Sequence, residues 1–335
     1  MRPAMYIGST DEKGIYTMLE SFLLELIASS EIEEVEIQLN ADNVIRIISS
    51  GFNVGPFVEK LNILKKGYES SDEDALYKTL DLAIIICLSS KVHLEVYDAG
   101  KIHKLSGGRG EYEKTIDEGY LREDLIMEFT PDRNVFHEYK IDYEKINSMY
   151  ERIAYINPDI KIMSVDDARD EYQRRVFHYP KGLANKMDRL IDERSADEPL
   201  IRFDLEKAHG DFHYAVSLAL LDYPDNSYVQ SFAGFSETLH HGSLVDGSIA
   251  GMVQAVETFA DKKGVNVNIS TQRIKESGFF FLASVLGAEY NFAGSQKLKL
   301  EMPEVELGAK EVVFSELSRY LVENEEKALD FINRF

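Results

Sequence analysis

The sequence predicts an α+β protein in which helices cover one face of mixed, largely antiparallel sheets. Two observations lead to this class. Segments with apolar residues at every third or fourth position, typical of helices, alternate along the 335 residues with segments of alternating apolar and polar residues, typical of strands. Several strand segments also come in pairs joined by short polar turns, which indicates β-hairpins. The length favours two domains, which we expect at 1–185 and 186–335.

The first half begins with a loop and an amphipathic helix. The stretch RPAMYIGSTDEKG (2–14) contains one proline and two glycines, which predict a loop and turn. Residues 15–30 have apolar side chains at spacings of three and four, as a helix requires. Residues 34–40 and 44–49 alternate in polarity on either side of a short turn and predict a hairpin. Further elements are expected as a helix within 56–67, a helix at 76–89, a hairpin at 93–106, a strand at 125–132, a helix at 144–157 and two strands within 159–179.

The second half follows a charged segment. Residues 187–199 look like the end of a helix followed by a linker. Beyond them we expect strands at 212–221 and 228–232, a helix at 248–264, strands at 265–269 and 278–286, and a terminal helix from about 310 to 335. The second domain is therefore also predicted to be α+β.

Composition excludes several classes of function. The net charge of −22 argues against direct DNA binding, which depends on clustered Lys and Arg, and favours basic partners. No apolar run approaches the roughly 18 residues of a membrane span, and the N-terminus lacks the pattern of a signal peptide. The single cysteine, Cys87, lies in the longest apolar run and is expected to be a core residue. We therefore expect a cytoplasmic protein without a membrane segment.

Several motifs, in order, carry a family resemblance. RPAMYIGS resembles the RPGMYIGS signature that opens the ATPase domain of the DNA gyrase B protein (GyrB-type) and of its topoisomerase IV relatives. Other similar segments are GKIHKLSGG (100–108), FTPDRNVF (129–136), FHYPKGL (177–183), SYVQSFAGFSETLHHGSLVDGSIAGM (227–252) and FAGSQKLKLEMPEV (292–305). The resemblance implies a Bergerat-type (GHKL) ATP-binding sandwich followed by a transducer domain of the ribosomal-protein-S5-like type. In the family this pair dimerises on ATP and gates DNA passage, and we expect this chain to lack the DNA-cleavage region.

The resemblance also implies an ATP site, whose chemistry needs four kinds of group. They are a carboxylate general base, an oxygen ligand for Mg²⁺, an Asp for the adenine amino group and a glycine-rich lid around the phosphates. The family's first motif, Glu-x-x-x-Asn on the first helix, falls on Ser21 and Glu25. Glu20 lies next to the first position but points about 100° around the helix. Glu25 and Glu20 remain as catalytic candidates, and ordinary exposed helix carboxylates are the alternative interpretation.

The other pocket motifs are largely replaced. Ser50 stands where the family has the adenine-binding Asp, and a hydroxyl is a weaker, uncharged acceptor. Gly51 matches the motif, but Phe52 replaces its Arg. The lid reads EDALYKTLD (73–81), and side chains there would keep the backbone away from a phosphate. The Gly-Thr motif before the strand at 125–132 reads Asp124-Leu125.

One element of the implied site persists, because Lys297 in SQKLKL falls where the family has a lysine that reaches the γ-phosphate. If a nucleotide binds, the candidate residues are Glu25, Ser50, Gly51 and Lys297. The sequence SGGRG (106–110) is rich in glycine but follows a hairpin, so we expect a mobile loop there. Adjacent His240 and His241 rarely converge on one ion, so we expect a loop pair or contacts with the first domain, and no metal site.

The sequence therefore favours a non-hydrolysing binding or regulatory module on the gyrase B scaffold. Its expected partner is a second copy, as a homodimer, or a gyrase or topoisomerase IV subunit. One alternative is a divergent ATPase module of a type II topoisomerase, with ATP and Mg²⁺ as cofactors. Another is an acidic, DNA-mimicking inhibitor of a basic DNA-binding surface. No cofactor is expected under the first interpretation.

Overall fold

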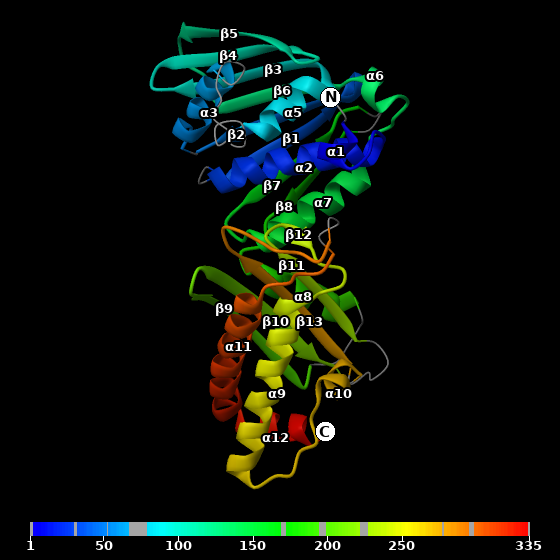
Figure 1. The fold of residues 1–335 in the computed structure, drawn as a ribbon, viewed down its shortest axis with the longest axis vertical. Helices are drawn as coiled ribbons and strands as arrows, with labels where there is room; N and C mark the ends of the chain where they lie inside the picture. The colour runs from blue at the N-terminus through cyan, green and yellow to red at the C-terminus, as the bar shows by residue number, and fades with distance from the viewer. Residues whose placement is uncertain are drawn as a thin grey trace. The chain divides into compact units, whose positions relative to one another are not determined.

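The chain folds into two compact units, Met1–Pro180 and Lys181–Phe335 (Figure 1). The computed structural model describes residues 3–29, 32–51, 53–66, 79–168, 172–193, 199–221, 227–276, 278–294 and 298–333. Each unit contains one mixed sheet and several helices, so the predicted α+β class is confirmed. The sequence predicts a domain boundary after residue 185, whereas the structure divides the chain after Pro180.

The first unit contains an eight-stranded sheet with the order β5-β4-β3-β6-β2-β1-β7-β8. Its strands are β1 Glu34–Asn40, β2 Val44–Ser50, β3 Ser89–Asp98, β4 Lys101–Gly108, β5 Glu111–Glu118, β6 Leu125–Pro131, β7 Lys161–Asp166 and β8 Gln173–Phe177. Strands β1 and β7 are parallel, and the other neighbours are antiparallel. In β1, Val35, Ile37 and Leu39 are buried and the residues between them are partly exposed, so one face of the sheet faces a core.

Helices of the first unit cover that buried face (Figure 1). They are α1 Ala4–Ile7, α2 Glu12–Ser29, α3 Gly55–Lys66, α5 Leu80–Leu88, α6 Arg133–Phe136 and α7 Tyr143–Ile156. The apolar positions of α2 are inserted in the core, as the three-and-four spacing predicts: Ile15, Leu19, Phe22 and Leu26 are each 1% exposed or less. The opening stretch forms one helical turn, α1, rather than only a loop.

The glycine-rich sequence at 106–110 is a fixed turn, not a mobile loop. It joins β4 to β5, an edge strand that the sequence pattern does not reveal because its residues are mostly charged. The backbone N–H of Arg109 donates to Ser89 O at 2.8 Å, and that of Gly110 donates to Ile86 O at 3.1 Å. A Cβ at Gly108, whose φ is +154°, would lie 2.5 Å from Ser90 O. Glycine therefore serves close backbone approach within the fold here.

The second unit contains a five-stranded sheet with the order β12-β11-β13-β10-β9. Its strands are β9 Ile201–His209, β10 Phe212–Leu220, β11 Tyr228–Ala233, β12 Ser236–Glu237 and β13 Phe279–Leu286. Strands β11 and β13 are parallel. Its helices are α8 Leu183–Glu193, α9 Ser243–Lys263, α10 Thr271–Lys275, α11 Pro303–Glu323 and α12 Glu325–Ile332. Within the described residues, no helix has the length and apolar character needed to cross a membrane.

Three predicted elements of the second unit are wrong in extent or type. Helix α9 begins at Ser243 rather than at 248, and the terminal helix begins at Pro303 and is interrupted at Asn324. Proline is well placed in the first turn of a helix, where its missing N–H has no partner to lose. Residues 265–269 form no strand, although they alternate in polarity. Their apolar side chains pack on the core without a neighbouring strand.

Helices α9 and α11 pack with their backbones unusually close. A Cβ at Gly247 would lie 2.1 Å from Glu306 O, and a Cβ at Gly251 would lie 2.4 Å from Lys310 O. Real Cβ atoms cannot approach backbone oxygens so closely, so any side chain at either position must separate the helices. The two glycines, one turn apart on α9, therefore determine the spacing of this helix pair.

We predict that Gly251→Ala lowers the free energy of unfolding by about 1–3 kcal/mol, because the methyl group overpacks the contact with Lys310. The loss should occur even though Ala favours a helix by about 1 kcal/mol over Gly. Urea unfolding measures the difference. Glu257→Ala, on an exposed position of α9, is the control and should change stability by about 0.5 kcal/mol or less. An equally or more stable Gly251→Ala variant would contradict the close packing.

Candidate functional site

Helices α2 and α3 meet through two contacts that are one helical turn apart. Phe22 of α2 and Phe57 of α3 pack edge to face with their ring centroids 6.1 Å apart. Three residues further along each helix, the Glu25 carboxylate forms an ion pair with the Lys60 ammonium. Because positions i and i+3 share a helix face, these contacts form one continuous interface. Glu25, a predicted site residue, therefore faces α3.

The Lys60 ammonium is largely removed from water. The Lys60 side chain is 12% exposed, and that of Glu25 is 35% exposed. Burial lowers the pKa of Lys60, and the nearby negative charge of Asp81 opposes that shift. Burial also raises the pKa of Asp81, with Lys60 opposing. Asp81 lies in the first turn of α5, so charged groups from α2, α3 and α5 gather in one partly buried cluster.

The neighbouring edge strand positions α3 and hence Lys60. The hydroxyl of Tyr112 donates to Leu64 O at 2.6 Å, and the ammonium of Lys114 donates to Leu61 O. Both donors belong to β5, and both acceptors are carbonyls in the last turns of α3, where carbonyls lack partners within the helix. The sequence pattern does not reveal this support, because β5 has only one aliphatic residue, Ile116.

The second carboxylate candidate on α2 faces a different helix. Glu20 forms an ion pair with Arg152 of α7, and the side chains are 25% and 27% exposed. The structure therefore does not bring Glu20 and Glu25 together. Ser21, at the position of the implied general base, is partly exposed on α2. Neither carboxylate is an ordinary solvated residue, since each has a cationic partner on another helix.

The end of β2 is bound to the start of β6. Ser50 is the exposed last residue of β2, and Gly51 follows it with φ +76°. The backbone N–H of Gly51 donates to Asp124 Oδ2 at 2.7 Å, and the N–H of Asp124 donates to Ser49 O at 3.1 Å. A carboxylate thus lies beside the predicted site residues, but it comes from the opposite strand. In the sequence, Asp124 shows only that a Gly-Thr motif is replaced.

Several predicted features lie in or beside parts of the chain that are not described. Lys297, Phe52 and residues 73–78 of the lid motif are outside the described residues. The segment that contains Lys297 is bounded by a hydrogen bond from Ala293 N to Lys299 O at 2.9 Å. The described residues contain no group of three His, Cys, Asp or Glu side chains able to hold a metal ion.

The two adjacent histidines form part of a paired loop. The backbone N–H of His240 donates to Leu298 O at 2.8 Å, and the N–H of Leu300 donates to His241 O at 2.9 Å. The His241 Nδ1 lies 3.1 Å from Ser231 Oγ, which is fully buried on β11. These contacts join the loop before α9 to the segment before α11. They give the histidines a structural role, as the loop-pair interpretation expects.

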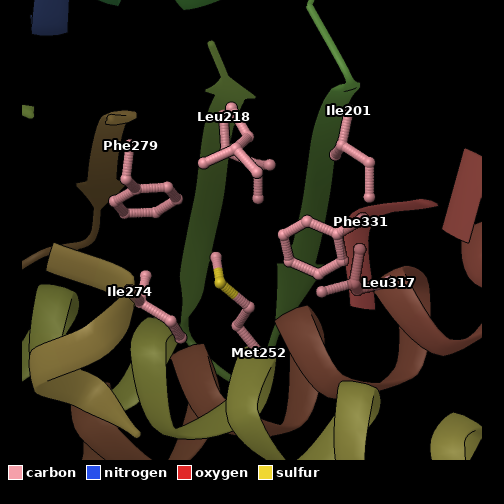
Figure 2. Close-up of a pocket in the computed structure, with 8 residues that line it drawn as sticks. Ile201, Leu218, Met252, Ile274, Phe279, Leu317 and Phe331 are labelled. Atoms are coloured by element: carbon pink, nitrogen blue, oxygen red, sulfur yellow. The ribbon is translucent and has the colours of Figure 1, made fainter. Parts of the chain in front are cut away.

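A cavity in the second unit is too small and too apolar to be a ligand site. Figure 2 shows its side chains pointing toward one another from strands β9, β10 and β13 and from the helices that face them. They are Ile201, Leu218, Leu220, Met252, Ile274, Phe279, Leu317 and Phe331. Its volume is about 10 Å³, about the space of one water molecule, and its lining offers no polar group to such a molecule. It is a packing defect of the core.

Comparisons with known proteins agree on one family. The DNA gyrase B family model matches residues 181–335. The B subunit of DNA gyrase from Clostridium acetobutylicum is 26% identical over 96% of this chain and 54% of that protein. The B subunit of DNA topoisomerase 4 from Mycoplasma capricolum is 22% identical over 96% of this chain and 53% of that protein.

Solved structures show the same fold. The 43K ATPase domain of Thermus thermophilus gyrase B, determined in complex with an aminocoumarin, matches with a TM-score of 0.80 and 23% identity. The match covers 99% of this chain and 93% of that one. The B-subunit of DNA gyrase from Myxococcus xanthus matches with a TM-score of 0.76 and 18% identity, over 96% of this chain and 94% of that one.

The resemblance carried by the sequence motifs is thereby confirmed. The chain spans about half the length of the curated relatives it matches. The agreement extends over nearly all of the chain, in sequence as well as in fold. The chain belongs to the family of DNA gyrase and topoisomerase IV B subunits and has the GHKL-type fold of their ATPase domains.

Proposed function

We propose that this chain is a gyrase-B-like binding or regulatory module that does not hydrolyse ATP. One observation carries the proposal: the Glu25 carboxylate is paired with the Lys60 ammonium. The family resemblance implies a metal-holding side chain at the position of Glu25. An ammonium in contact with that carboxylate competes with Mg²⁺, a hard cation that needs several oxygen ligands. We interpret the nucleotide site as degenerate.

The remaining described residues support the same interpretation. Asp81 places a negative charge at the start of α5, where a polyphosphate would meet electrostatic repulsion. Ser50 offers only a hydroxyl for the adenine amino group, and one oxygen of Asp124 already accepts from Gly51. Glu20, paired with Arg152, is not available as a replacement base. These residues do not fit Mg²⁺–ATP as the resemblance implies it.

The DNA-mimic alternative receives less support, because the exposed sheet face carries paired charges. Arg46 lies 3.2 Å from Glu128, Lys104 lies 2.9 Å from Asp117, and Lys161 lies 2.8 Å from Glu34. A surface that imitates the DNA backbone presents unpaired negative charges to a basic partner. On this face, Lys and Arg side chains partly neutralise the carboxylates. We therefore favour recognition of a protein surface over imitation of DNA.

We further propose that Met1–Pro180 is the GHKL ATPase-like domain and Lys181–Phe335 the transducer-like domain. The relatives are B subunits of gyrase and topoisomerase IV, so the partner that fits best is a second copy of this chain or such a subunit. The module would act in the cytoplasm by forming or blocking a subunit contact, independently of an ATP cycle.

We predict that ATP does not stabilise the protein. In thermal unfolding with and without Mg²⁺–ATP at millimolar concentration, the Tm should not change. A ligand at about 100 times its Kd would add about 2.7 kcal/mol and would raise the Tm by several degrees. Magnesium chloride alone at matched ionic strength is the control. A Tm increase that needs both ATP and Mg²⁺ would instead support the divergent ATPase.

We predict that the protein associates through its family contacts in the absence of nucleotide. Sedimentation velocity of the chain alone, and of the chain mixed with the gyrase and topoisomerase IV subunits of its own organism, measures both forms of pairing. The expected result is a dimer or a mixed complex whose amount is the same with and without ATP. A chain that remains monomeric in every mixture would contradict the pairing proposal.

A further inference from the structure

We propose that the Lys60 ammonium is a built-in cation that takes the place of a bound ligand and holds α2, α3 and α5 together. Its side chain comes from α3, contacts Glu25 of α2 and lies in the field of Asp81 of α5. The inference deepens the proposed function and rests on it in one respect, that no nucleotide enters this space. It adds that the protein itself supplies the positive charge between the helices.

The burial of Lys60 distinguishes this contact from a surface ion pair. Its side chain is 12% exposed, whereas Lys161, which pairs with Glu34 on the open sheet face, is 36% exposed. A solvated lysine loses little when its partner is removed, since water replaces the carboxylate. A buried ammonium or carboxylate left without its partner is strongly unfavourable. Lys60 and Glu25 must therefore be retained or lost together.

The surrounding contacts show that Lys60 is placed, not free to swing away. Phe57, one turn earlier on α3, is buried against Phe22 of α2. Leu61 and Leu64 are also buried, and their carbonyls accept hydrogen bonds from β5. These contacts anchor the helix on both sides of Lys60. The lysine stem can reach its buried position without moving α3, so the cluster is available in the folded protein at all times.

The consequence is a first unit whose helices are held without a ligand. In a ligand-dependent protein, a bound cation supplies the charge between such carboxylates only when it is present. Here the charge is covalently attached and cannot dissociate. The arrangement of α2, α3 and α5 should therefore be independent of metal ions and nucleotides. The surfaces that these helices carry would be presented to a partner constantly.

A double-mutant cycle on the full chain tests this role. We predict that Lys60→Ala lowers the Tm by about 4–10 °C, while the control Lys161→Ala lowers it by about 2 °C or less. Glu25→Gln should also lower the Tm. The double variant should be no less stable than Lys60→Ala alone, because it no longer contains an uncompensated carboxylate on α2.

Chemical rescue provides an independent readout. Ethylammonium chloride should raise the Tm of Lys60→Ala more than sodium chloride at the same ionic strength, because the small cation can enter the space that the side chain leaves. It should not do so for Lys161→Ala or for the double variant. If Lys60→Ala does not fold, the cycle is completed with Lys60→Met and read from Glu25→Gln and the Met-containing double variant.

Additive effects of the two substitutions, or equal responses of Lys60→Ala and Lys161→Ala to ethylammonium, would overturn the inference. This failure differs from failure of the proposed function. Nucleotide binding by the wild-type chain would remove the non-hydrolysing interpretation even if the two residues are coupled. Uncoupled residues would remove the built-in cation even if no nucleotide binds.

Discussion

The burial of one lysine ammonium between helices is the constraint on which the first unit depends. Lys60 can occupy its place only because Glu25 and Asp81 supply negative charge from two other helices. Strand β5, at the sheet edge, fixes the helix that carries it. The same packing brings α2 into contact with α3 through aromatic rings. A single electrostatic requirement thus joins the edge of the sheet to the core beneath the helices.

The family scaffold persists where it serves packing. Ile7 of the opening stretch is buried, and a Cβ at Gly14 would lie 2.2 Å from Ser9 O, so the chain there is kept close by the fold itself. Pocket positions, by contrast, carry side chains that satisfy one another, as Gly51 and Asp124 do. A scaffold can preserve shape in this way while it exchanges ligand contacts for internal ones. Fold and function separate at the level of individual side chains.

Strong periodicity made much of this fold predictable from sequence. Helix α2 and the hairpin β1–β2 follow from spacings that local geometry alone enforces. Strand β5 could not be predicted, because an edge strand needs few apolar residues and its pairing partner is chosen by the sheet. Residues 265–269 show the reverse error, since alternation records burial and not hydrogen bonding. The predicted site residues were found, but their partners Lys60 and Arg152 come from distant segments that no spacing rule connects.

The interpretation of the site rests on what occupies the space between α2, α3 and α5. Crystals grown with Mg²⁺ and a non-hydrolysable ATP analogue would test it most directly. We expect electron density for the Lys60 ammonium against Glu25 and no nucleotide beside it. A bound nucleotide with Mg²⁺ held by Glu25, and Lys60 turned away from it, would contradict both the degenerate site and the built-in cation.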